Sequence, residues 1–574
     1  MMEKIWKVWD TIPEAVSERL AELQPLTRQM LYRRGLAEPE QARQFLQAEY
    51  EGQTSPFLFQ DMAKAVARIW QAIEAREKIT VYGDYDADAV TASAVLLRTL
   101  RHLGAEADSY IPDRFTEGYG VNLQAIEKLA LAGTRLVITV DCGTNSCDAA
   151  DSCKKLGMDF IITDHHEIIG DKPFALALIN PKNSDDQYPY RELTGVGVAF
   201  RLAQALVSDD KAKKFAKDYV PGWEKWLLDL VAIGTVADCH SLLGENRVLV
   251  KYGLKVLAKT RWPGLRALSA AAGLDFAQKA PDTYTLGFVL APRLNAAGRL
   301  EHAGVALDLL LEDDAVAAQQ KAAALNEINQ RRQNLTQVVL GETREQALLQ
   351  SHRPILLLYK PGWPKGVVGL VAGRLAEEFH KPVLVLEQGE EESTGSARTA
   401  GEFDLIAALK PAAHLLSKFG GHKQAAGLTL PNRNLEEFYK VLVTEAGRQE
   451  ANASEAVAWL EAELGEADLN LETAAQIELF EPFGTANPRP QFLIKGLVIL
   501  SLRLVGAAGQ HMQAKLLLGK TEVPGIMFNA AGIAKKLKVG DTVDATAELL
   551  REEWNGQRLK LKIVEMRINQ QFNG

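Results

Sequence analysis

Three short apolar segments, each followed at once by acidic or histidine side chains, constrain the fold of this chain most strongly. The segments span residues 80–83, 136–140 and 161–163, and they run into 84–88, Asp141 and 164–166. Stretches with helical character, 92–103 and 122–132, lie between them, and this alternation is typical of βαβ units around a parallel sheet. A fourth apolar stretch, 230–236, ends just before Asp238, and we expect it to be another strand of that sheet.

The polar residues at these four tips predict a metal site. Ligands of open α/β sheets bind outside the carboxyl ends of the strands, so the tips should converge on one crevice. Carboxylate oxygens favour hard ions such as Mg²⁺ or Mn²⁺, and imidazole also suits Mn²⁺. Asp86 and Asp88 can point the same way if their segment is extended, and Asp141 can bridge two ions. Two ions about 4 Å apart are a common physical solution for phosphoester hydrolysis.

The alternative for each aspartate is helix capping. An aspartate after a strand often accepts a hydrogen bond from the first backbone N–H groups of the next helix. Capping explains any one of these residues as well as metal binding does, but it does not explain four acidic tips together.

Length and composition indicate an ordinary multidomain protein. A chain of 574 residues is too long for one hydrophobic core, and no apolar run approaches the roughly 18 residues of a membrane span. The N-terminus lacks the apolar core of a signal peptide, so we expect a cytoplasmic protein. The four cysteines form no Cys-x-x-Cys pair, which favours reduced thiols over disulfides or structural zinc.

The charge distribution is compatible with a polyanionic partner. The net charge is −9, but residues 491–570 carry twelve basic against seven acidic side chains. Local basic patches on an acidic protein can bind phosphates, although solvated faces of mixed charge would give the same composition.

The pattern of elements predicts a multidomain α/β protein with a parallel-sheet catalytic core, a long connecting helix, a second α/β domain and a C-terminal β-barrel. The long helix is expected within 313–345, where glycine and proline are missing up to Gly341. The expected divisions are a helical N-terminal segment (1–75), the core (76–245), a helical region with the long helix (246–345), the second α/β domain (346–450) and the barrel (455–574).

The tips resemble a known family in order and spacing. Asp86-Ala87-Asp88-Ala89, Asp141, Asp164-His165-His166 and Asp238 are similar to the four motifs of the DHH phosphoesterase superfamily. Further stretches resemble the RecJ family, which comprises bacterial single-strand-specific 5′→3′ exonucleases. These stretches are 195–200, 291–299, 396–398, 420–422 and 482–488.

The RecJ resemblance implies a fold and an activity. It implies a DHH domain, a DHH-associated domain and an OB-fold, with hydrolysis of single-stranded DNA from the 5′ end to mononucleotides in DNA repair and recombination. The implied cofactors are two Mn²⁺ or Mg²⁺ ions per active site. The expected partners are single-stranded DNA and, further, single-strand-binding protein and a helicase; the expected state is a monomer.

The resemblance also implies roles for individual residues. Asp86 and Asp141 would hold one metal, while Asp88, Asp141, His165 and Asp238 would hold the other, and His166 would face the scissile phosphate. Many DHH enzymes have a histidine where this chain has Tyr82, so Asp84 is the candidate replacement ligand. Ala89 stands where glycine is common in the family.

Substrate-binding residues are expected outside the metal motifs. Arginine binds phosphate bidentately, and the candidates for the 5′-phosphate are Arg114, Arg293, Arg299, Ser396 and Arg398. His422, preceded by two glycines, is expected to contact substrate. In the barrel, Lys515, Arg558, Lys560 and Lys562 are expected to contact phosphates, whereas Phe528 and Trp554 either stack on bases or pack in the core, the latter being favoured.

Two other functions stay open. A phosphodiesterase of short oligonucleotides or cyclic dinucleotides would share the metal site but would not need the basic barrel or the long helix. A non-catalytic DNA-binding relative in a replication complex would be expected to have lost ligands, and none is lost here.

Overall fold

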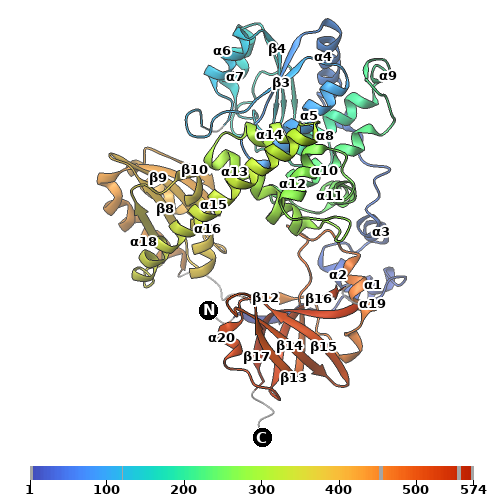
Figure 1. Ribbon diagram of the computed structural model, residues 1–574, viewed down its shortest axis with the longest axis vertical. Helices are drawn as coiled ribbons and strands as arrows, with labels where there is room; N and C mark the ends of the chain where they lie inside the picture. Colours follow the sequence, from blue (N-terminus) through green and yellow to red (C-terminus); the bar gives the residue numbers. More distant parts are fainter. Residues whose placement is uncertain (1–3, 119, 451–456, 553–556, 570–574) are drawn as a thin grey trace. The chain divides into compact units, whose positions relative to one another are not determined.

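The computed structural model describes residues 4–118, 120–450, 457–552 and 557–569, which form two compact units. The larger unit comprises 54–238 and 253–454, and the smaller one comprises 1–53, 239–252 and 455–574. Figure 1 shows the elements of both. Among the described residues, no helix combines the length and the apolarity needed to cross a membrane.

A five-stranded, fully parallel sheet forms the first half of the larger unit, in the order β3-β2-β4-β5-β6. Helices α6 and α7 cover one face through a cluster that includes Ile126, Cys153 and Phe160. Helices α4, α5 and α8 belong to the other side. The strands are β2 (Lys78–Tyr82), β3 (Ala107–Tyr110), β4 (Thr134–Val140), β5 (Asp159–Thr163) and β6 (Ala177–Ile179). The helices are α4 (Met62–Ala75), α5 (Ala87–His102), α6 (Leu123–Leu131), α7 (Cys147–Lys155) and α8 (Gly195–Ser208).

The prediction that residues 230–236 form a fourth strand is wrong. Residues 230–236 lie in helix α10 (Leu228–Ala237), and Asp238 is its C-cap. The helix is buried from Leu228 to Thr235, so it is apolar on all sides and shows no helical periodicity in sequence. A short, fully apolar run does not distinguish a buried helix from a buried strand.

Helices continue the larger unit up to its second sheet. Their longest member, α15 (Ala315–Leu349), confirms the predicted long helix and spans about 50 Å. Its N-terminus is capped by Asp314, whose carboxylate accepts from the N–H of Ala317 at 2.8 Å. The others are α9 (Ala212–Phe215), α11 (Gly244–Leu257, shared with the smaller unit), α12 (Pro263–Ala271), the π-helix η3 (Thr285–Leu290), α13 (Ala291–Leu300) and α14 (Gly304–Leu310).

The second sheet is mixed, with the order β10-β11-β9-β8-β7, and only β7 and β8 run parallel. Helix α16 and the C-terminal half of α15 pack on one face, and α17 and α18 pack on the other. The elements are β7 (Leu356–Lys360), α16 (Lys365–Phe379), β8 (Val383–Gln388), β9 (Glu392–Arg398), α17 (Leu405–Leu409), β10 (Lys418–His422), β11 (Ala425–Pro431) and α18 (Leu435–Glu450).

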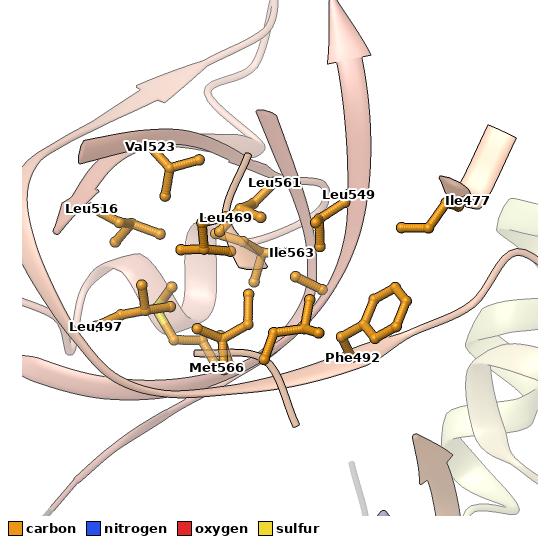
Figure 2. Packing of buried hydrophobic residues seen from close by; sticks show 14 of the residues in the cluster. Leu469, Ile477, Phe492, Leu497, Leu516, Val523, Leu549, Leu561, Ile563 and Met566 are labelled. Carbon is orange, nitrogen blue, oxygen red and sulfur yellow. The ribbon is translucent and has the colours of Figure 1, made fainter. Parts of the chain in front are cut away.

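The smaller unit contains the predicted barrel. Five strands close in the order β13-β14-β15-β17-β16, with β15 and β17 parallel, which is the OB-fold arrangement. Leu497, Leu516, Leu561 and Ile563 fill the interior (Figure 2). The elements are β12 (Val457–Leu460), α19 (Leu471–Glu478), β13 (Phe492–Val505), β14 (His511–Leu518), β15 (Thr521–Met527), α20 (Ala531–Ala534), β16 (Thr542–Glu552) and β17 (Arg558–Ile568).

The N-terminal residues belong with this barrel. Helices α2 (Pro25–Arg33) and α3 (Pro39–Gln47) contribute Leu31 and Phe45 to its core cluster, and Val16 of α1 (Glu14–Arg19) packs against it. Arg247 ties the parts together, because its guanidinium donates to the carbonyls of Phe45 and Phe480 at 2.9 and 2.7 Å. Residues 5–8 form strand β1 (Ile5–Val8), which pairs in parallel with β12, so this part of the predicted helical segment is wrong.

Candidate metal centre and substrate-binding residues

Three of the four predicted tips meet at one histidine. Nε2 of His165, after β5, lies 3.0 Å from Oδ1 of Asp141, after β4, and 3.7 Å from Oδ2 of Asp238, at the end of α10. Asp141, His165 and His166 each present a ligand atom within 4.8 Å of the others. Asp238 therefore reaches the crevice although it follows a helix.

Asp88 is held at the start of α8. Its two oxygens accept from the backbone N–H groups of Gly195 and Val196 at 2.8 and 3.0 Å. Gly234 on α10 leaves the space for this carboxylate, because a Cβ there would lie 2.7 Å from Oδ1 of Asp88. The buried carboxylate of Asp88 is thus positioned by three helices: it lies in the first turn of α5, binds the N-terminus of α8 and fits beside Gly234 of α10.

Asp141 occupies a similarly restricted place. Its φ of +59° is unusual for a residue other than glycine, and its N–H donates to the carbonyl of Thr163 at 3.0 Å. A Cβ at Gly195 would come within 2.4 Å of both Cβ and Oδ1 of Asp141. Oδ1 is buried and accepts no hydrogen bond from the described residues, which leaves it available to a cation.

Asp86 combines the two roles considered for it. Its Oδ1 caps α5 by accepting from the N–H of Ala89 at 3.0 Å, and its side chain is exposed at the mouth of the cluster. Asp84 is buried and accepts from the N–H of Tyr85 at 2.7 Å. Helix capping and a place in the acidic cluster are therefore not alternatives at Asp86.

The electrostatics of the cluster fit a divalent cation. Burial, followed by the neighbouring carboxylate of Asp86, raises the pKa of Asp84 to about 7 and likewise that of Asp238 to about 7. Burial and the repulsion of neighbouring carboxylates raise the pKa values of Asp88 and Asp141 well above the ordinary range. Buried carboxylates that repel one another are stabilised when a cation lies between them, and the set of oxygen and imidazole donors suits Mn²⁺ or Mg²⁺.

Asp164 serves His166 directly. Its Oδ1 lies 2.7 Å from Nδ1 of His166, and its other oxygen accepts from the N–H of Thr144 at 2.9 Å. Burial opposes the charge of Asp164, but this hydrogen bond lowers its pKa below the usual range and raises the pKa of His166. Asp164 was predicted only as one of the polar residues of the third tip, and the structure gives it the individual role of orienting His166.

Three of the predicted substrate arginines lie near one another. Burial, then the nearby guanidinium groups of Arg114, Arg332 and Arg398, lower the pKa of Arg299 to about 10. Arg114 lies over the ring of Tyr85 at 4.8 Å and is close enough to Asp84 to lower its pKa. The arginines therefore adjoin the first acidic tip.

Two other arginines change the predicted set. Arg293 donates to Asn326 at 3.0 Å and to the carbonyl of Val289 at 2.6 Å, and its charge, after burial and Arg374, helps to lower the pKa of Arg332. Arg332 on α15 was not predicted; it is buried, and its Nε has no acceptor within the described residues. The sequence carries no signal for this residue, because a basic residue in a long polar helix is ordinarily exposed.

Ser396 and Arg398 face α16 from the second sheet. A Cβ at Gly369 would lie 3.2 Å from Oγ of Ser396 and 3.3 Å from Nη2 of Arg398. Arg398 pairs across the sheet with Ala425, and Ala425 pairs with exposed His422 on β10. His422 thus lies in the same row as Arg398, two strands away on the edge strand β10.

Helix α13 connects the arginines to the first acidic tip. Oδ1 of Asn295 accepts from the N–H of Ala87 at 2.8 Å, and a Cβ at Gly298 would lie 2.5 Å from the carbonyl oxygen of Tyr85. Asn295 and Gly298 in the Asn-Ala-Ala-Gly-Arg stretch are therefore explained by packing of α13 against the first acidic tip, and a substrate contact is not needed to account for them.

The basic residues of the barrel are less available than expected. Glutamates pair with Lys515, Lys560 and Lys562 at 2.5, 2.9 and 3.1 Å. Phe528 is exposed and contacts His511 edge-on, so the favoured prediction of core packing is wrong for it. Trp554 lies outside the described residues.

Comparison with known proteins gives three matching families. The model of the DHH family, N-terminal domain, matches residues 78–235, that of the DHHA1 domain matches 352–447, and that of the RecJ OB domain matches 460–565. A curated relative named single-stranded-DNA-specific exonuclease RecJ, from Bacillus subtilis, is 36% identical over 95% of this chain and 68% of its own length. Another of that name, from Dickeya dadantii, is 34% identical over 96% and 97%.

Solved structures agree with these sequence matches. A crystal structure of RecJ in complex with Mn²⁺ from Thermus thermophilus covers 99% of this chain and 80% of its own, with a TM-score of 0.83 and 29% identity. The same protein in complex with Mg²⁺ gives a TM-score of 0.77. Identity, coverage and the common fold together show that this chain belongs to the RecJ family.

Proposed function

We propose that this protein is a metal-dependent exonuclease that degrades single-stranded DNA from the 5′ end and releases mononucleotides, with a role in DNA repair and recombination. One observation carries the proposal: a group of partly buried arginines adjoins an acidic cluster that can hold metal ions, within the same compact unit. The arginines suit a terminal phosphate, and the acidic cluster suits the bond next to it. The names of the relatives support single-stranded DNA as the substrate.

The metal ligands divide between two positions. Asp86 and Asp141 would hold one ion, and Asp88, Asp141, His165 and Asp238 would hold the second, with Asp84 as an added ligand or as a carboxylate that orients one. Such a pair of ions, when bound, activates water and stabilises the oxygen that leaves phosphorus. Asp141 supports this assignment best, because Nε2 of His165 lies 3.0 Å from its Oδ1, and that oxygen accepts no hydrogen bond from the part of the chain that the structure describes.

His166 would act on the scissile phosphate. Its Nδ1 is engaged by Asp164 at 2.7 Å, and this contact fixes the ring and directs Nε2 away from Asp164. A raised pKa favours the protonated ring, which donates a hydrogen bond to a phosphate oxygen.

The terminal phosphate would bind to Arg114, Arg299, Ser396 and Arg398, with Arg332 behind them. Guanidinium groups that repel one another gain from an anion between them, as the lowered pKa of Arg299 indicates. A pocket of this kind measures the distance from the chain end to the scissile bond, so the enzyme removes one nucleotide at a time. Single-strand-binding protein and a helicase are proposed as further partners.

A digestion of end-labelled single strands tests the proposal. With a 5′ label, the first labelled product should be a mononucleotide in the presence of Mn²⁺ or Mg²⁺, whereas a 3′ label should remain on progressively shorter strands. EDTA should stop both reactions. Release of the 3′ label first, or cleavage of circular single strands, would contradict the proposal.

A further inference from the structure

The small parallel ribbon of β1 and β12, which stands outside the closed barrel, carries an unusual face. We use the name tryptophan ribbon for β1 (Ile5–Val8), Trp9 and β12 (Val457–Leu460). Lys7 lies directly opposite Trp459 in its register, and Ile5 lies opposite Val457. Alternation along the strands therefore puts Ile5, Lys7 and Trp9 on the same face as Val457 and Trp459.

The opposite face of the ribbon holds it to the barrel. The indole N–H of Trp6 donates to Oε2 of Glu565 at 2.7 Å, and the guanidinium of Arg567 lies 3.8 Å from the centre of the Trp6 ring. Leu460 is completely buried in the same unit. Attachment of the ribbon is thus explained without Trp459, which is 48% exposed.

The outer face presents stacked indole rings flanked by cations. Trp9 and Trp459 stack with their ring centres 3.8 Å apart and an angle of 15° between the planes. Arg33 lies 4.6 Å from the centre of Trp9, and Lys7 lies 5.9 Å from the centre of Trp459. Trp459 remains 48% exposed although Trp9 covers one of its faces, and the ammonium group of Lys7 lies over its ring.

The balance of charge on this face favours an anion. Lys7 and Arg33 are cationic, and Asp10, the exposed residue after Trp9, is the acidic neighbour in the sequence. Glu461, which follows β12, is nearly buried and pairs with Arg34 at 3.5 Å. For Lys7, the described part of the chain provides no ion-pair partner within 4.0 Å.

We propose that the outer face of the tryptophan ribbon is a second binding surface for single-stranded DNA, on which a base stacks on Trp459 while a neighbouring phosphate contacts Lys7. Indole rings stack on any unpaired base, and lysines attract the backbone regardless of sequence. A protein partner fits less well, because only Ile5 and Val457 are aliphatic here and lysine is depleted at the centres of protein interfaces. The inference rests on the proposed function, since it extends the binding of the same substrate.

Binding of a fluorescent single strand of about 50 nucleotides to the full-length protein in EDTA tests the proposal, because hydrolysis is then blocked. Trp459→Leu should weaken binding about 5- to 100-fold and should reduce the preference for a normal strand over an abasic strand of equal length. Trp459→Tyr should retain most of the affinity. Lys7→Glu should lower the slope of log K against log salt by about 0.7 or more, whereas Trp459→Leu should leave this slope unchanged.

Lys155→Glu provides the matched control for charge reversal. Lys155 is exposed at the C-terminal end of α7, before β5, and thus lies at the sheet edge opposite the acidic tips. This variant should bind as the parent does, and all variants should hydrolyse a saturating short oligonucleotide at the parental rate, because the ribbon is outside the metal centre.

Two results separate the inference from the proposed function. If the parent binds and degrades single strands but Trp459→Leu and Lys7→Glu bind them as tightly, with the same salt slope, the ribbon is not a DNA surface and the proposed function is unaffected. If the parent itself neither binds nor degrades single strands, the proposed function fails and the inference fails with it. If Trp459→Tyr weakens the binding of single strands as much as Trp459→Leu does, the argument that a base stacks on this ring is also overturned.

Discussion

Gly195 is the position where one added methyl group should remove most of the activity. In Gly195→Ala the new Cβ would lie 2.4 Å from both Oδ1 and Cβ of Asp141, whereas ordinary contacts begin near 3.4 Å. Cβ of Asp141 is fixed by its backbone, so rotation of the side chain cannot relieve this contact, and the main chain of residue 141 or 195 has to shift. The carboxylate would be displaced by about 1 Å, the scale on which positioning of reacting groups matters.

A displacement of this size should cost about 100-fold in kcat/KM, or roughly 2.7 kcal/mol of transition-state stabilisation. Mn²⁺ affinity should also fall, because Asp141 is the proposed shared ligand. Thermal stability should fall as well, because the roughly 0.5–1 kcal/mol that alanine gains over glycine in a helix offsets only part of the strain.

Gly197→Ala is the matched control in the same helix turn. Its Cβ would meet Cδ2 of Leu193 at 3.2 Å, the end of a flexible side chain, so only a small adjustment is needed. The assay is steady-state hydrolysis of a single strand at fixed Mn²⁺, together with calorimetric titration of Mn²⁺ into each variant. A Gly195→Ala enzyme within about threefold of the parent and of Gly197→Ala, with parental Mn²⁺ affinity, would refute the placement of Asp141 as the shared ligand.

Three further substitutions test separate parts of the structure. Asp141→Ala should leave the protein folded by circular dichroism but reduce hydrolysis below about one per cent of the parent, because one carboxylate serves both ions. Arg398→Ala should reduce the preference for a 5′-phosphorylated over a 5′-hydroxyl strand by about ten- to a hundredfold, while hydrolysis of a small chromogenic phosphodiester falls much less; equal loss on all three substrates would contradict a role in end recognition. Burial raises the pKa of Asp229 from 3.8 to about 7, so its neutral form stabilises the fold at low pH and this contribution is lost as pH rises. Urea unfolding should therefore show Asp229→Asn gaining stability relative to the parent between about pH 4 and 7, by up to about 4 kcal/mol, and a pH-independent difference would contradict the shifted pKa.

The acidic tips were predictable because their placement follows from chain direction alone. In a parallel sheet every strand delivers its C-terminal residue to the same edge, so Asp141 and His165 meet without any knowledge of side-chain packing. The metal site followed from this placement, and the prediction that the site belongs to a nuclease came from the family resemblance.

Tertiary packing determined what the sequence pattern did not reveal. Helix α10 looked like a strand because its burial on all sides removes the helical period. Arg332 escaped notice because a basic residue in a long polar helix is ordinarily exposed, and only the fold of α15 against α13 buries it. The pairing of β1 with β12 joins residues about 450 positions apart in the sequence, and a local sequence pattern cannot predict which distant strand will pair with β1.

Tyr82 shows how this chain manages without the histidine that many DHH enzymes carry at that position. Its hydroxyl donates to the carbonyl of Gly120 at 3.2 Å and accepts from the N–H of Asn122 at 3.1 Å, so it fixes the loop that follows Arg114. Burial raises its pKa above the normal range, and a neutral phenol is a poor ligand for a hard cation.

Asp84 stands two residues further on, where the chain has left the strand. It is buried, and the three charges that act on its carboxyl are Asp86, Arg114 and His166, so it lies where the acidic cluster, the arginines and the candidate phosphate donor adjoin. A carboxylate in that position both complements a cation and restrains Arg114. The site can therefore keep its number of ligands although tyrosine stands in place of histidine. Tyr82 stabilises the loop that follows Arg114, and Asp84 supplies the negative charge.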